Sequence, residues 1–150
     1  MIIIGKFYED LEIGEKHTSS GRTITETDIV TFAGVSGDYN PLHTDREYAR
    51  KSVFGQRIAH GALTFSVMTG LWDSLGFLRE TVVAFYGVDS MRFIKPVHIG
   101  DTVHLELEIT EKKEREKDGL VTILNRVFNQ NQQEVMVCRS ILMMKKKTLK

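Results

Sequence analysis

Asp38 and His43 lie five positions apart in the segment SGDYNPLHTD and could act together in proton transfer. Gly37 and Pro41 interrupt both helical and strand periodicity there, so the segment is predicted to be a loop. A carboxylate and a neutral imidazole near one water molecule can move two protons in one event. Histidine titrates at about pH 6.5, close to the usual working pH. Pro41 restricts the backbone between the two side chains, and the spacing predicts an acid–base pair.

A second candidate element is the segment IAHGAL, in which His60 and Gly61 precede an apolar helical pattern. The first amides of a helix have no intrahelical acceptor and carry partial positive charge. Because Gly61 has no side chain, a ligand oxygen could approach its N–H closely. Such a donor stabilises a carbonyl oxygen that gains negative charge during a reaction. His60 could contact a substrate or shape the loop. Alternatively, Gly61 allows tight helix packing and His60 is a polar capping residue.

Two other interpretations of the loop residues stay open. Asp38 could cap a turn, with His43 as a polar residue near the start of a helix. Asp38, His43 and His60 could instead bind a metal ion. Their spacing lacks the compact His pairs and Cys clusters that are typical of zinc sites, so we expect no metal site.

Short helices are predicted on both sides of the loop. A capping pattern at Thr25 predicts a helix that ends near Gly34, and the same pattern at Thr44 predicts a second helix to about Arg50. His43 would then lie immediately before a helix N-terminus.

The longest helical pattern covers residues 61–75, where apolar residues recur at every fourth position among small ones. Beyond it the period changes to two, which predicts strands within residues 82–97, 101–110, 120–128 and 134–144. The sequence therefore predicts an α+β fold in which a mainly antiparallel sheet curls around one long buried helix.

Composition excludes several classes of protein. The 150 residues are 41% hydrophobic and 27% charged, and the formal net charge is zero, which argues against nucleic-acid binding. The single cysteine, Cys138, lies in an apolar run, so a buried structural thiol in a reducing compartment is expected. No run of about 18 apolar residues and no signal peptide is found, so we expect a cytoplasmic protein without membrane contact.

Two segments, TFAGVSGDYNPLHTDREYA and FGQRIAHGALTFSVMTGL, resemble the MaoC-like dehydratases, which include the R-specific enoyl-CoA hydratases. The family pattern G-D-x-N-P-L-H is matched by Gly37, Asp38, Asn40, Pro41, Leu42 and His43, and the later A-H-G by Ala59, His60 and Gly61. The stretch MRFIKPVHIGDTV is similar to the family as well, and the resemblance covers nearly the whole chain.

The resemblance implies a single hotdog domain over residues 1–150, a long central helix wrapped by a curved antiparallel sheet, and a homodimer. In the family, the residues that match Asp38 and His43 hold the catalytic water, and the amide that matches Gly61 belongs to the oxyanion donor. Asn40 and His60 would bind substrate or shape the loop. The implied reaction is reversible hydration of a trans-2-enoyl thioester, carried by coenzyme A or acyl carrier protein, to an (R)-3-hydroxyacyl thioester. No cofactor is implied, because the thioester itself acidifies C2.

Two other functions stay open. A hotdog thioesterase would place a carboxylate on the central helix, where Asp73 is the candidate, and fold alone does not fix the chemistry. A non-catalytic acyl-thioester-binding protein or regulatory subunit is the other alternative.

Overall fold

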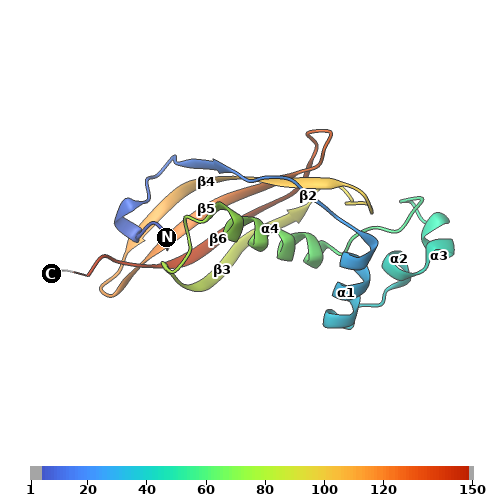
Figure 1. The fold of residues 1–150 in the computed structure, drawn as a ribbon, viewed down its shortest axis with the longest axis horizontal. Helices are drawn as coiled ribbons and strands as arrows, with labels where there is room; N and C mark the ends of the chain where they lie inside the picture. Colours follow the sequence, from blue (N-terminus) through green and yellow to red (C-terminus); the bar gives the residue numbers. More distant parts are fainter. Residues whose placement is uncertain (1–4, 149–150) are drawn as a thin grey trace.

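The computed structural model describes residues 5–148, which form an antiparallel sheet, one long helix against it and three shorter helices beyond the N-terminal end of that helix (Figure 1). In chain order the elements are η1 (Tyr8–Asp10), β1 (Lys16–Thr18), β2 (Arg22–Thr23), α1 (Glu26–Ser36), α2 (Pro41–Thr44), α3 (Arg46–Arg50), α4 (Gly61–Leu75), β3 (Val82–Phe93), β4 (Thr102–Glu114), β5 (Asp118–Phe128) and β6 (Glu134–Lys145). Among these residues no helix is long and apolar enough to cross a membrane.

The sheet has the strand order β1-β4-β5-β6-β3, and β2 pairs with the beginning of β4. All the pairs are antiparallel. Strand β3 lies at one edge, where it pairs with β6 through three register shifts. Bulges of this kind twist and bend a strand, so β3 curves around α4 (Figure 1).

The core lies between α4 and the sheet. Five large residues of α4 are buried, namely Leu63, Val67, Met68, Leu71 and Trp72. The indole Nε1–H of Trp72 donates to Asn125 Oδ1 of β5 (2.8 Å), which ties the helix to the sheet beneath it. The helix over residues 61–75 and the α+β class are confirmed, and the arrangement is a hotdog fold. Cys138 is buried in this core, and burial raises the pKa of its thiol, as expected for a structural cysteine.

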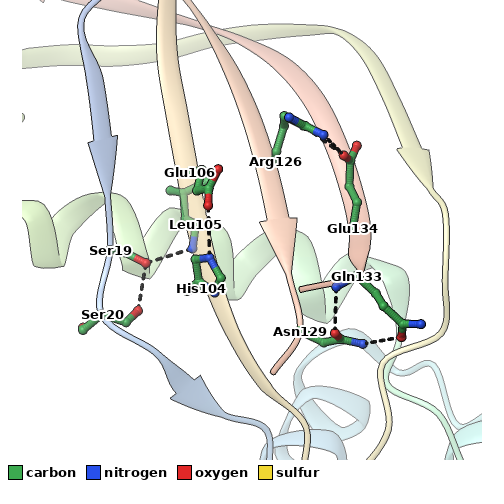
Figure 2. A network of polar contacts seen from close by, with 9 residues as sticks. All are labelled: Ser19, Ser20, His104, Leu105, Glu106, Arg126, Asn129, Gln133 and Glu134. Atoms are coloured by element: carbon green, nitrogen blue, oxygen red, sulfur yellow. Dashed lines mark hydrogen bonds and ion pairs between the residues drawn. The ribbon is translucent and has the colours of Figure 1, made fainter. Parts of the chain in front are cut away.

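Side-chain hydrogen bonds stabilise two connections of the sheet, the segment between β1 and β2 and the turn between β5 and β6 (Figure 2). Between β1 and β2, the amide of Leu105 donates to Ser19 Oγ (2.9 Å), so the chain stays attached to β4 after β1 ends. In the β5–β6 turn, the amide of Gln133 donates to Asn129 Oδ1 (3.1 Å), and Asn129 Nδ2 donates back to the Gln133 side chain (3.1 Å).

Helix α1 begins where the sequence predicts but ends later. The amide and hydroxyl of Thr25 donate to Asp28 Oδ2 (2.8 and 3.0 Å), which completes the predicted cap. Burial alone would raise the pKa of Asp28, but the bonds from Thr25 and the charge and hydrogen bond of Arg22 together outweigh it and hold that pKa below its usual value. The predicted end near Gly34 is wrong, because the helix continues to Ser36 and stops at Gly37, whose φ of 75° suits glycine.

The helix predicted from Thr44 to about Arg50 is present as α3, but its cap lies one residue later than predicted and an additional short helix precedes it. The structure has two short helices there, α2 capped by the side chain of Asn40 and α3 capped by Asp45. Pro41 occupies the first turn of α2, where a missing N–H costs nothing. His43 therefore lies within a one-turn helix, two residues before the Asp45 cap of α3, and the segment 36–45 is only partly a loop.

Candidate active site

Asp38 lies in the turn between α1 and α2, and local hydrogen bonds shape that turn. The amide of Asp38 donates to Ser36 Oγ (3.1 Å), and the amide of Asn40 donates to Asp38 Oδ1 (3.2 Å). Asn40 in turn accepts from the amide of Leu42 through its own Oδ1 (3.0 Å). Asp38 is exposed, with one carboxylate oxygen used by the turn. Asn40 thus shapes the backbone between Asp38 and His43.

His43 is fixed by the segment that precedes α4. The amide of Ile58 donates to the carbonyl of Leu42 (3.2 Å), so the two segments run side by side. The Nδ1 of His43 lies 2.7 Å from the carbonyl oxygen of Ile58. Because a carbonyl oxygen only accepts, Nδ1 carries the proton, and in the neutral ring Nε2 has a free lone pair. His43 is thereby held in the tautomer that can accept a proton at Nε2.

His60 packs against both of these residues. Its Nε2–H donates to the main-chain carbonyl of Asp38 (2.9 Å), and its ring stacks on that of His43 with a centroid separation of 3.8 Å and an interplanar angle of 27°. His60 is 2% exposed. The structure therefore brings Asp38, His43 and His60 together, with one donor or acceptor atom of each within 4.8 Å of the other two.

The two imidazole rings are not oriented like two ligands of one metal ion. The rings of His43 and His60 are nearly parallel, and their lone pairs lie in the ring planes, so the two rings do not converge on one point. The expectation that there is no metal site stays a prediction.

Gly61 is the first residue of α4 and lies next to His60 in the chain. Its amide is in the first helical turn, where an N–H has no intrahelical acceptor. Gly61 also lines a pocket of about 260 Å³. The other lining residues are mainly apolar and come from the segment before α4, from α4 itself, from the end of β3 with the segment that follows it, and from β6: Phe54, Ile58, Ala59, Thr64, Phe93, Ile94, Lys95, Pro96, Val97 and Val135.

Neither Asp38 nor His43 lines this pocket, and the link between the two regions is the chain itself, because Gly61 lines the pocket and its neighbour His60 lies beside Asp38 and His43. Phe93 is a pocket residue that the sequence reasoning missed. A Cβ atom on Gly61 would lie only 2.9 Å from the ring of Phe93, so glycine is what allows this ring to pack there. Nothing in the sequence signals the contact, because the two residues are 32 positions apart.

Asp73 lies far from this group. It is exposed near the C-terminal end of α4, where Arg79 Nη2 lies 3.3 Å from its carboxylate. Twelve residues of helix separate it from Gly61, which corresponds to about 18 Å. Asp73 therefore cannot act on a group bound at Gly61 of the same chain.

Comparison with known proteins identifies relatives over most of the chain. The family model described as MaoC like domain matches residues 10–131. The chain is 36% identical to an (R)-specific enoyl-CoA hydratase of Rhodospirillum rubrum, over 90% of this chain and 94% of that protein. It is 39% identical to Protein MaoC of Klebsiella aerogenes, but it spans only 31% of that longer protein. A crystal structure described as a monoamine oxidase regulatory protein from Archaeoglobus superposes with a TM-score of 0.90 at 40% identity, covering 96% of this chain and 97% of that one.

Proposed function

Because the chain belongs to the MaoC-like domain family of hydratases and dehydratases, we propose that it is a hydro-lyase for trans-2-enoyl thioesters with an (R)-3-hydroxyacyl thioester as product. The observation that carries this proposal is that Asp38 and His43 lie close together beside the N-terminus of α4, with His43 held by the Ile58 carbonyl in the tautomer whose Nε2 can accept a proton. The substrate would be carried by coenzyme A or acyl carrier protein, and no cofactor is required.

The mechanism follows from the groups around one water molecule. Asp38 and His43 hold the water and accept one of its protons as its oxygen adds to C3. The C2=C3 double bond becomes an enolate, and the charge on the thioester oxygen is stabilised by the Gly61 N–H and the dipole of α4. The pair then returns one proton to C2 on the same face. The net reaction is the addition of H and OH from one water molecule across the C2=C3 double bond, with no other reactant.

The test is an assay with enoyl-CoA substrates of increasing chain length, beginning with trans-2-butenoyl-CoA. We expect loss of the enoyl ultraviolet absorbance without release of free thiol, and a chiral product analysis should give the R alcohol. Release of thiol would indicate a thioesterase instead. Tight binding of these thioesters without either change would indicate the non-catalytic alternative.

A homodimer is part of the proposal, because one side of the chain is left open. Strand β3 is an edge strand, and several of its apolar side chains are exposed, namely Val83, Phe85, Tyr86 and Val88. The uncovered face of α4 beside it carries the small residues Ala62, Ser66 and Gly70. A strand with one unpaired edge, next to a helical face of small side chains, is suited to pairing with a second copy. The cytoplasmic location stays a prediction.

Gly70→Arg tests this arrangement. A Cβ at Gly70 meets no atom within 4 Å, and replacing a mid-helix glycine raises helix propensity by about 1 kcal/mol, so a single chain should fold well. Light scattering should give twice the chain mass of 17.1 kDa for the unaltered protein and the single mass for the variant. Thr18→Arg on β1, at the opposite sheet edge, is the control that should remain dimeric. A dimeric Gly70→Arg protein would contradict the proposed interface.

A further inference from the structure

His60 contacts or adjoins each of the three groups assigned to the reaction. It precedes Gly61 in the chain as the N-cap residue of α4. Its Nε2–H donates to the carbonyl of Asp38, and its ring stacks on His43. The buried residue His60 is thus connected to three groups: the turn that carries Asp38, the imidazole of His43 and the amide of Gly61 at the start of α4.

The contacts of His60 are not those of a helix cap. Although it occupies the N-cap position, its side chain accepts no hydrogen bond from the first turn of α4. Its Nδ1 is buried without a partner among the described residues, which is unfavourable for a polar atom. The contacts that fix the ring lie outside the first turn of α4. They are the hydrogen bond to the Asp38 carbonyl, the stack on His43, and an edge-to-face contact with Phe32 at a centroid separation of 5.0 Å. The capping interpretation of His60 is therefore wrong, and its polar contact points toward the Asp38 turn.

We propose that His60 is a positioning residue whose hydrogen bond to the Asp38 carbonyl fixes the Asp38 turn against the N-terminus of α4. The turn needs such a tether because it follows Gly37, a left-handed glycine with no side chain to pack. The Asp38 side chain is exposed, so its position depends on the backbone that carries it. A displacement of about 1 Å in a catalytic group can lower a rate by about a hundredfold. The catalytic consequence of the tether rests on the proposed function, whereas the tether itself does not.

Two substitutions separate the hydrogen bond from the ring. His60→Gln places an amide N–H where Nε2–H lies and can keep the bond to Asp38, but it loses the stack. His60→Phe keeps an aromatic ring against His43 and has no donor. If the phenyl ring prevents folding, His60→Leu serves as the variant without a donor. Circular dichroism and thermal melting establish that each protein is folded.

The kinetic test uses hydration of trans-2-butenoyl-CoA. We expect His60→Phe to lower kcat at least about tenfold with KM changed by less than about threefold, because substrate still binds while the water is misplaced. His60→Gln should keep kcat within about threefold of the unaltered protein. An unchanged kcat in His60→Phe, or an equal loss in His60→Gln, would overturn the proposal.

Amide hydrogen exchange gives a second readout that needs no activity. The amides of Asn40, Leu42 and His43 are bonded within the turn region, to Asp38 Oδ1, Asn40 Oδ1 and the Asn40 carbonyl. In His60→Phe these amides should exchange about tenfold faster or more, and in His60→Gln at the original rate. Equal exchange in all three proteins would overturn the tether. If the unaltered protein does not hydrate enoyl-CoA, the proposed function fails, and exchange alone decides the role of His60.

Discussion

Asp38→Asn and His43→Asn should each lower kcat for enoyl-CoA hydration at least about a hundredfold, the scale of general acid–base catalysis. We expect both changes to preserve the local fold. In Asp38→Asn, the amide oxygen of the new side chain can still accept from the Asn40 N–H, as Asp38 Oδ1 does at 3.2 Å. An asparagine at position 43 can still donate to the Ile58 carbonyl, which now binds Nδ1 at 2.7 Å. What is lost is a charged carboxylate in one variant and the Nε2 lone pair in the other.

The control for the histidine is His104→Gln, a partly buried histidine of β4 whose Nε2 lies 3.4 Å from Glu106 Oε1. It should keep its activity, and circular dichroism should show all three variants folded. The double variant should lose little more than either single one, because the two residues act on the same water. Retained hydration in either single variant would show that the assigned pair is not the catalytic one.

Removing the amide proton of Gly61 should have the largest effect, a loss of about 10² to 10³ in kcat, as for other oxyanion donors. Proline achieves this with little disturbance of the helix, because Gly61 is its first residue. The preceding residue, His60, already has φ −57° and ψ 139°, the conformation that proline requires before it. Gly61→Pro therefore deletes the N–H and adds a ring at the same position.

The matched control is Gly61→Ala, which keeps the N–H and adds a Cβ. Since any Cβ here would lie 2.9 Å from the Phe93 ring, both changes are made in a Phe93→Ala background. The difference in kcat between the two double variants then gives the contribution of the Gly61 N–H. Thermal melting should be similar for the pair. If the proline and alanine proteins turn over enoyl-CoA at the same rate, the Gly61 amide does not stabilise the oxyanion.

Much of the fold can be predicted from the sequence because it depends on local periodicity. The α4 boundaries at Gly61 and Leu75 are correct, since a sustained apolar stripe distinguishes a long buried helix from its surroundings. The cap at Thr25 is correct because it needs only neighbouring residues. The errors lie at short helices, where one turn can form at several places and packing chooses between them. The inclusion of His43 in α2 is such a case.

The residue types of the candidate site are also visible in the sequence, but their arrangement is not. Asp38 and His43 are only five positions apart, so their proximity could be predicted from spacing alone. The tautomer of His43 depends on its contact with the Ile58 carbonyl. The orientation of His60 depends on its hydrogen bond to the Asp38 carbonyl. The pocket surface next to Gly61 depends on the ring of Phe93. These partners lie 15, 22 and 32 positions apart. Such contacts arise only when β3 curves around α4 and the α1–α3 segment packs beyond its N-terminus, and no local pattern encodes that packing.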